Sequence, residues 1–456
     1  MSPQPITPAQ VADLQEAFAH DPLGRLARNA VAKNSLHAVA LNRAVVAGTD
    51  HVFSVQLPSN PITDQKSSGR CWLFAGLNLF RVEAMQRLNV DNIELSQNYL
   101  LFWDKIEKAN YLLETILATL DEPTDGRLIT FLLHSPLQDG GQWDMFVNLV
   151  AKYGVVPKSV MPETESSSNT RIMTAMMTTL LREQAATLRR MHAAGVGIVE
   201  LRERKQAMVG QFYRMLCIHL GEPPQEFEWQ WRDKDKQFHR AGTLTPQEFF
   251  TRYVGYDLDK MVCLIHCPTA DKPFNRLYTI QHLGNVVEGQ IVRYLNVDLS
   301  VFKQAAIAML QDGQPVWFGC DVGKQSHPEL GILDTQLYDY ASVYGARFAA
   351  DKAERVEYGH SMMTHAMVFT GVDLDDDGKP RKWRVENSWG EKIGDKGFLV
   401  MSDAWFDEYM YEVIVDKRFV SAEVLALLET DPVVLPPWDP MGALAVAGGE
   451  LLNDRV

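Results

Sequence analysis

The sequence feature that most constrains the fold is the junction between a polar loop and an apolar segment at Cys71. The run from Asp64 to Arg70 is polar and contains a glycine, whereas apolar residues crowd the segment from Trp72 to about Arg87 without a proline. This pattern predicts a loop that delivers the cysteine to the first turn of a buried helix. Unpaired backbone N–H groups and the helix dipole favour a thiolate at that position. The alternative is a small buried cysteine without a chemical role, as most free cysteines are.

Two distant segments strengthen the chemical interpretation. Residues 363–369 predict a buried strand that opens at His365, and residues 383–390 predict a second strand that leads through Asn387 into a turn. The sequence of residues 375–380, Asp-Asp-Asp-Gly-Lys-Pro, is typical of a hairpin turn. A hairpin would bring the imidazole and the carboxamide together.

Cysteine, histidine and asparagine in that chain order, with Gln65 upstream, are the parts of a thiol acyl-transfer site. One imidazole nitrogen could face the thiolate while the other meets the asparagine oxygen. The motifs around these residues resemble those of the papain-like cysteine peptidases. They are Ser68-Gly69-Arg70-Cys71-Trp72, His365-Ala366 and Asn387-Ser388-Trp389-Gly390.

Departures from the usual papain-like pattern narrow the resemblance. Ser68 stands where a first cysteine would be, so the disulfide made in secreted relatives cannot form. His365 lies 294 residues after Cys71, whereas the usual spacing is about 130 to 150. With Asp139-Gly140-Gly141-Gln142-Trp143 and the run from Trp438 to Ala445, the chain resembles the bleomycin hydrolase / aminopeptidase C family.

The resemblance implies an α+β, papain-like fold of two parts, with a helical half, a β-sheet half, a large helical insertion and N- and C-terminal arms. We expect an N-terminal arm in 1–50, packed across the second half, and the helical half with the nucleophile in 51–160. Residues 161–285 would form an insertion that serves oligomerisation or restricts the cleft, and helices are expected up to about residue 280. The β half with His365 and Asn387 would span 286–430, and a C-terminal arm in or near the cleft would span 431–456.

The same resemblance implies the roles of the site residues. Cys71 would be the nucleophile, His365 its acid and base, Asn387 the group that orients the imidazole, and Gln65 an oxyanion donor. Substrate-binding positions would be Gly140, Gly141, Trp72 and Trp389. The glycine pair permits close approach of another main chain, although an ordinary turn would also explain it. No metal and no cofactor are expected.

The implied activity is that of a thiol aminopeptidase acting through a thioacyl-enzyme on peptides with a free N-terminus and on related amides, including that of bleomycin. The family is similar in forming a hexameric ring, in which the C-terminal arm lies in the active-site groove. Here Val446 to Val456 continue beyond the family-like run. Overfilling of the groove, self-trimming and a foreign remnant are all compatible with this extension, and we hypothesise that the active form ends close to Ala445 or Val446.

Composition and charge exclude several classes of protein. A net charge of −14 and a pI near 5.4 disfavour general affinity for nucleic acids. No basic and apolar leader opens the sequence, and no apolar run approaches the length of a membrane span. Five cysteines in no disulfide-like arrangement indicate a reducing, cytoplasmic location.

Two segments imitate metal sites. Cys263, His266 and Cys267 lie in an apolar run without a second ligand pair, which favours a buried strand over a zinc site. Asp373, Asp375 and Asp377 imitate the start of a calcium loop. Arg384 occupies the twelfth position, which requires a bidentate glutamate, so the segment is expected to be a turn.

Two other functions remain as alternatives. A transglutaminase-like acyltransferase would also use cysteine and histidine, but the Gln65–Cys71 spacing and an asparagine partner argue against it. A catalytically silent scaffold or nucleic-acid binder is disfavoured because all four catalytic positions carry competent residue types. The sequence leaves the preferred side chains and the physiological substrate open.

Overall fold

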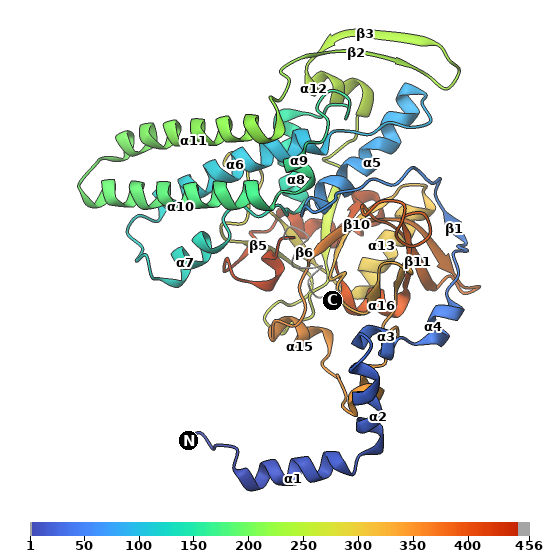
Figure 1. Cartoon of the computed structure of the whole chain (residues 1–456). Helices are drawn as coiled ribbons and strands as arrows, with labels where there is room; N and C mark the ends of the chain where they lie inside the picture. Colours follow the sequence, from blue (N-terminus) through green and yellow to red (C-terminus); the bar gives the residue numbers. More distant parts are fainter. Residues whose placement is uncertain (1, 446–456) are drawn as a thin grey trace.

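The computed structural model describes residues 2–445. In this part of the chain, twelve strands form one mixed sheet, and helices pack around it (Figure 1). The α+β fold class predicted from the sequence is confirmed.

Helix α5 (Cys71–Leu88) is the central element of the helical half. It is apolar around most of its circumference and buries residues on every side, as a helix enclosed by other elements must. It ends at Asn89, whose left-handed backbone closes the last turn. Helix α6 (Gln97–Ala118) begins after Ser96, whose side chain accepts a hydrogen bond from the amide of Tyr99. The end of α5 agrees with the apolar segment to about Arg87 that the sequence indicated. Further helices of this half are α7 (Arg127–His134), α8 (Trp143–Tyr153) and α9 (Glu165–Ser168).

The main sheet has the strand order β14-β5-β6-β4-β13-β7-β10-β11-β12-β9-β8, and β1 pairs with β10. Strand β7 lies at the middle of this order, and the predicted hairpin is the antiparallel pair β10 and β11. The strands are β1 (Val55–Gln56), β4 (Met261–Ile265), β5 (Arg276–Ile280), β6 (Tyr294–Asn296), β7 (Val316–Cys320), β8 (Ser326–His327), β9 (Ile332–Leu333), β10 (His365–Leu374), β11 (Pro380–Glu386), β12 (Phe398–Ser402), β13 (Met410–Asp416) and β14 (Val433–Leu435).

The two faces of the sheet are covered by different helices. Trp317 and Phe318 are consecutive residues of β7, so their side chains point to opposite faces. The Trp317 indole donates a hydrogen bond to the carbonyl of Trp72 on α5, whereas Phe318 stacks on Phe369, which in turn packs against Phe406. Helices of the sheet half are α13 (Leu299–Gln311), α14 (Tyr340–Tyr344), α15 (Lys352–Glu357), α16 (Asp403–Tyr409) and α17 (Ala422–Leu425).

A long helical hairpin projects from the helical half (Figure 1). Its helices are α10 (Arg171–Ala193) and α11 (Ile198–Leu220), and both contact α6. The continuous helical character expected up to about residue 280 ends at Leu220. The chain then forms the hairpin of β2 (Phe227–Arg232) and β3 (Phe238–Leu244), the short helix α12 (Pro246–Phe249) and strands β4 and β5 of the main sheet. Alternating aromatic residues in β2 explain the difference, because they favour a strand.

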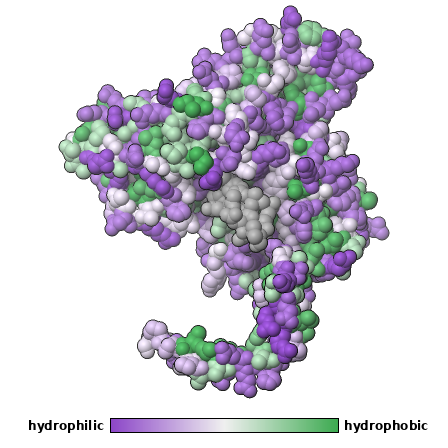
Figure 2. All heavy atoms as spheres, viewed as in Figure 1, coloured by the Kyte–Doolittle hydropathy of each residue, from purple (hydrophilic) through white to green (hydrophobic). Residues whose placement is uncertain are grey.

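The first two helices of the N-terminal arm extend away from the rest of the protein, whereas its last two lie beside the sheet half (Figure 1). Its helices are α1 (Pro8–Ala19), α2 (Pro22–Val31), α3 (Leu36–Ala40) and α4 (Arg43–Gly48). Neither α1 nor α2 has a buried residue, and α2 contacts α14 of the sheet half. Hydrophobic side chains therefore lie on the surface of the arm (Figure 2), with Leu23 72% and Leu14 65% exposed. The expectation that this arm packs across the second half is wrong for α1, whereas α2 and α3 contact α14 of that half.

Candidate active site

Cys71 is the first residue of helix α5, as the loop-to-helix pattern predicted. Its side chain is only 1% exposed, and the preceding residue, Arg70, makes no side-chain capping bond to the helix. Arg70 instead forms a two-pronged ion pair with Glu163, at 2.8 and 2.9 Å. The amides of Cys71 and Trp72 are thus left for the sulfur and for a ligand, whereas the amide of Leu73 donates to the carbonyl of Arg70.

Burial dominates the acidity of the thiol. It raises the pKa of Cys71 to about 11, and the nearby Asp139 carboxylate acts in the same direction. The backbone amides of Ala366, Trp72 and Cys71 itself act in the opposite direction. The structure therefore differs from the expectation that the helix terminus alone favours a thiolate, because removing the sulfur from water outweighs the amides. A thiolate at this position needs a neighbouring positive charge.

The β10–β11 hairpin brings the histidine and the asparagine together. The Nε2 atom of His365 lies 2.9 Å from the Oδ1 atom of Asn387. The ring of Trp389 packs against the imidazole with 4.8 Å between ring centroids. The amide of Ala366 lies against the Cys71 sulfur, so the start of β10 is next to the thiol. Cysteine, histidine and asparagine thus meet at one place.

Gln65 joins this group through a short backbone pairing. Its amide donates a hydrogen bond to the carbonyl of Ser388, at 2.8 Å, and Asp64 pairs with Trp389. The Ser388 hydroxyl donates to the Gln65 side-chain oxygen, and the side-chain nitrogen donates to the carbonyl of Ser68, both at 2.6 Å. A carboxamide nitrogen carries two hydrogens, so one of them remains for another acceptor.

The C-terminal arm lies against the glycine pair. The amide of Gly140 donates a hydrogen bond to the carbonyl of Ala445, at 2.9 Å, and the Gln142 side chain donates to the carbonyl of Ala443, also at 2.9 Å. A Cβ atom at Gly140 would collide with the backbone of Ala445. Main-chain pairing at this position is therefore made by the protein's own arm, and Val446 to Val456 lie outside the described residues.

Trp72 differs from its predicted role as a substrate-binding residue. Its side chain is 1% exposed, and its indole donates a hydrogen bond to the carbonyl of Asp139, at 2.7 Å. A Cβ atom at Gly141 would overlap the Trp72 ring. Because the indole is enclosed by protein, it supports the loop that carries Gly140 and Gly141 rather than offering a face to a ligand.

Three residues that organise the site were given no role from the sequence, although Asp139 and Gln142 belong to a motif named there. Asp139 and Lys105 form a buried ion pair of 2.6 Å beneath the nucleophile loop, and Gln142 holds the arm. One signal was present, since Lys105 is one of the four charged residues in 104–108, which lie between two apolar stretches of α6. A charge in such a position requires a buried partner. The identity of that partner depends on how distant segments pack.

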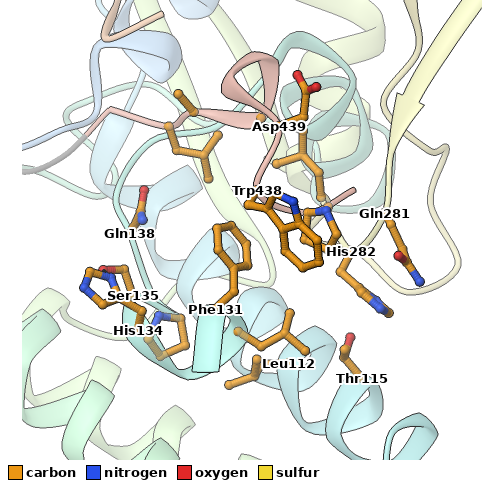
Figure 3. A pocket seen from close by; sticks show the side chains of 18 of the residues that line it. Leu112, Thr115, Phe131, His134, Ser135, Gln138, Gln281, His282, Trp438 and Asp439 are labelled. Carbon is orange, nitrogen blue, oxygen red and sulfur yellow. Dashed lines mark hydrogen bonds between the residues drawn. The ribbon is translucent and has the colours of Figure 1, made fainter. Parts of the chain in front are cut away.

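A cavity of about 520 Å³ flanks the base of the C-terminal arm (Figure 3). Leu112 and Phe131 line one side of it, and Trp438 of the arm lines another. The arm is anchored there by an ion pair of 2.9 Å between Lys272 and Asp439. Neither Cys71 nor His365 lines this cavity, so it holds the arm rather than the reacting groups.

The segments that imitate metal sites are structural. Residues 261–265 form the buried strand β4, and the Cys263 thiol lies 3.0 Å from a carboxyl oxygen of Glu412. Asp375 accepts hydrogen bonds from the amides of Asp377 and Lys379 and so closes the turn between β10 and β11. Within residues 2–445, no cluster of three or more histidine, cysteine or acidic side chains could hold a metal ion. No helix in the same range combines the length and apolar character needed to cross a bilayer.

Known proteins match this chain over nearly its whole length. The profile of the Peptidase C1-like family matches residues 5–442. Aminopeptidase C of Streptococcus thermophilus is 48% identical over 417 residues, which cover 91% of this chain and 94% of that protein. Bleomycin hydrolase of Homo sapiens is 44% identical over 454 residues, which cover 98% of this chain and 100% of that protein.

A solved structure gives the same result. The crystal structure of PepW from Lactobacillus rhamnosis HN001 is 47% identical in sequence, with a TM-score of 0.95 over 97% of this chain and 99% of that one. The resemblance inferred from the motifs is confirmed, and with it the papain-like fold. The chain belongs to the Peptidase C1-like family, among the relatives of aminopeptidase C and bleomycin hydrolase.

Proposed function

We propose that this protein is a cysteine aminopeptidase that removes N-terminal residues from peptides and hydrolyses related amides such as that of bleomycin. The observation that carries the proposal is the meeting of three groups. The His365–Asn387 hydrogen bond of 2.9 Å stands next to the Cys71 sulfur, against which the Ala366 amide packs. Relatives named aminopeptidase C and bleomycin hydrolase support the same activity.

In the proposed reaction, Cys71 transfers its proton to His365 and attacks the carbonyl carbon of the N-terminal residue. Because burial holds the pKa of the thiol near 11, the thiolate forms only together with the imidazolium. Asn387 accepts a hydrogen bond from the far side of the ring and keeps the imidazole aimed at the sulfur. Trp389, packed on the ring, shields this bond from water.

The tetrahedral intermediate places a negative charge on the former carbonyl oxygen. The remaining side-chain N–H of Gln65 and the backbone N–H of Cys71 would stabilise it. His365 then gives its proton to the leaving amine, the C–N bond breaks, and a thioester to Cys71 remains. Water attacks this thioester while His365 accepts the proton, and the free amino acid leaves with the thiol restored. No metal or cofactor enters these steps.

The C-terminal arm supplies the proposed selectivity for free N-termini. Its pairing with Gly140 and Gln142 occupies the main-chain positions that an extended peptide would otherwise use. Substrate is therefore left with room for one residue before the scissile bond. The hypothesis that the active form ends close to Ala445 or Val446 belongs to this proposal.

Two further features belong to the proposal. A hexameric ring would give the exposed apolar side chains of α1 and α2 a partner surface, since such residues are costly to leave in water. A cytoplasmic location agrees with the five free thiols, at Cys71, Cys217, Cys263, Cys267 and Cys320.

Hydrolysis of matched aminoacyl amides tests the activity. The free and the N-acetylated form of one fluorogenic amide are compared, without an amine acceptor, before and after treatment with a thiol alkylator. We expect release from the free form alone, its loss after alkylation, and its absence in Cys71→Ala. Equal hydrolysis of the acetylated form would overturn the aminopeptidase assignment, and near-normal activity of Cys71→Ala would overturn the choice of nucleophile.

A further inference from the structure

Asp139 is a buried carboxylate that bonds to the nucleophile loop from below. Its Oδ2 atom accepts a hydrogen bond from the amide of Gly69, at 2.9 Å, and another from the hydroxyl of Thr170. Its Oδ1 atom accepts one from the Lys105 ammonium, at 2.6 Å. The side chain is 1% exposed. Gly69 lies two residues before Cys71, so the carboxylate holds the backbone that delivers the sulfur.

The same residue also holds the opposite wall of the site. Its backbone carbonyl accepts the hydrogen bond from the Trp72 indole, and the next residue, Gly140, pairs with Ala445. The Lys108 ammonium fixes this wall by donating to the carbonyls of Gln138 and Gly140, at 2.9 and 2.6 Å. All cysteines are free, so these contacts are made without a covalent link between the two segments.

We infer that Asp139 is a positioning residue for the reaction, because its carboxylate sets the spacing between the nucleophile loop and the Gly140 segment that binds the arm. It contacts neither substrate nor reacting atoms and acts through Gly69 and Trp72. This inference rests on the proposed role of Cys71. Its physical basis is that a sulfur displaced by about 1 Å reacts about 10²-fold more slowly.

The charges near the Asp139 carboxylate and near the Cys71 thiol come from other side chains of the protein. Lys105, Lys108 and Asp104 of α6 face Asp139. Burial would raise the pKa of the Asp139 carboxyl, but the charge of Lys105 and the hydrogen bonds from Lys105, Thr170 and the Gly69 amide outweigh it and lower this pKa to about 2. Around Cys71 the titratable neighbours are Asp139, His365 at the start of β10, and Cys320, the residue paired with His365 on β7. The carboxylate is therefore ionised at every pH at which the enzyme would work.

The test measures turnover per reactive thiol in full-length Asp139→Asn. Asparagine keeps the shape of the side chain but removes the charge and turns one of its two oxygens into a donor, so either Lys105 or the Gly69 and Thr170 donors lose their acceptor. Active thiol is titrated with a radiolabelled aminoacyl chloromethyl ketone, which reacts through the folded site, and label on Cys71 is separated by peptide mapping from label on the four other free cysteines. The kcat and KM are measured on a free aminoacyl amide. We expect kcat per titrated thiol to fall about 10²-fold with KM nearly unchanged.

Titration of the active Cys71 thiol distinguishes a misplaced nucleophile from a protein that is partly unfolded. A variant that merely unfolds in part loses sites that the ketone labels at Cys71 and keeps wild-type kcat for each site that remains, whereas its other buried cysteines become more reactive. Thr170→Val removes one donor and keeps the ion pair. It should lower kcat per thiol by a smaller factor, between about threefold and tenfold, and it decides the question if Asp139→Asn does not fold.

Asp403→Asn is the matched control. Asp403 likewise accepts from a lysine and a tryptophan, Lys303 at 2.6 Å and Trp383 at 3.0 Å, but belongs to α16. It should leave kcat per thiol unchanged. Wild-type kcat per thiol in Asp139→Asn, or in Thr170→Val where the first variant is unfolded, would overturn the inference. Activity in Cys71→Ala would instead overturn the proposed function, so the two failures are distinguishable.

Discussion

The amide of Gly140 donates its hydrogen to the carbonyl of Ala445, so the C-terminal arm pairs with the segment that follows Asp139. This single contact connects the end of the described chain with the loop that lies beneath the nucleophile. It explains why a glycine stands at position 140, because any side chain there would meet the arm.

Gly140→Ala should weaken the proposed exclusion of N-terminally blocked substrates by the C-terminal arm. The added methyl group would collide with the backbone of Ala445 and displace the arm from the groove. We expect hydrolysis of the N-acetylated aminoacyl amide to become measurable, while kcat/KM on the free form drops about tenfold or more. Gly210→Ala on helix α11 is the control, since its Cβ would enter open space. An unchanged preference for the free form in Gly140→Ala would contradict the blocking role of the arm.

Gln65→Ala should reduce the rate of the chemical step. The variant loses the side-chain donor proposed for the oxyanion, and the Ser388 hydroxyl loses its acceptor. Removal of one such donor costs about 10²–10³ in kcat. Steady-state kinetics on the free aminoacyl amide should show this fall in kcat with a small change in KM. Asn387→Ala should likewise retain measurable turnover, in contrast to His365→Ala, which should retain none. A Gln65→Ala enzyme with wild-type kcat would exclude the carboxamide from the oxyanion site.

Glu386→Gln should change the pH dependence of stability. Burial raises the pKa of the Glu386 carboxyl from 4.5 to about 7, although Arg81 and Arg384 act in the opposite direction. The folded protein therefore binds this proton more tightly than the unfolded chain. The resulting stabilisation is complete below the unfolded pKa and is lost as the pH rises through about 7. Relative to the variant, the free energy of unfolding of the wild type should decline by about 3 kcal/mol across this range.

Urea denaturation at several pH values between about 4 and 8 measures this difference. Glu226→Gln, at an exposed position between α11 and β2, is the control and should follow the wild-type profile. Parallel profiles for Glu386→Gln and wild type would show that the carboxyl is ionised in the folded protein throughout.

Deletion of residues 2–31 should leave the folded core intact. Helices α1 and α2 bury none of their residues, so their removal should shift Tm by no more than about 2 °C. If these helices mediate assembly, the particle mass from light scattering should fall to that of a smaller oligomer. The full-length chain measured at the same concentration is the reference. A deletion variant that keeps the full-length assembly would assign the contacts between subunits to other surfaces.

Much of the site could be predicted because its signals are local. The polar loop before Cys71, the capping residue Ser96 and the turn at residues 375–380 each act over a few residues of chain. Patterns of this kind determine where helices and hairpins begin and end. The β10–β11 hairpin then brings His365 to Asn387 with little help from the rest of the fold.

Other features could not be predicted from such patterns. Helix α11 ends at Leu220 because Gly221, with a φ of +86°, and then two prolines follow it. That the chain next forms the β2–β3 hairpin, and not another helix, was not predicted from the periodicity. The orientation of the N-terminal arm depends on which surface covers the apolar faces of its helices. Hydrophobic periodicity shows that a helix has an apolar face but not which surface packs against it. The pKa of Cys71 depends on burial by segments that are distant in the chain.

The sequence by itself determined the family, the residue types of the site, and the two local structures that carry the thiol and the imidazole. Tertiary structure alone decided that the thiol is buried, that Trp72 supports a loop, that Asp139 and Lys105 lie beneath the nucleophile, and that Ala445 pairs with Gly140. The physical reason is the separation along the chain over which each kind of interaction acts. Backbone preferences and caps act between near neighbours, whereas desolvation and buried charge depend on every atom that packing brings close.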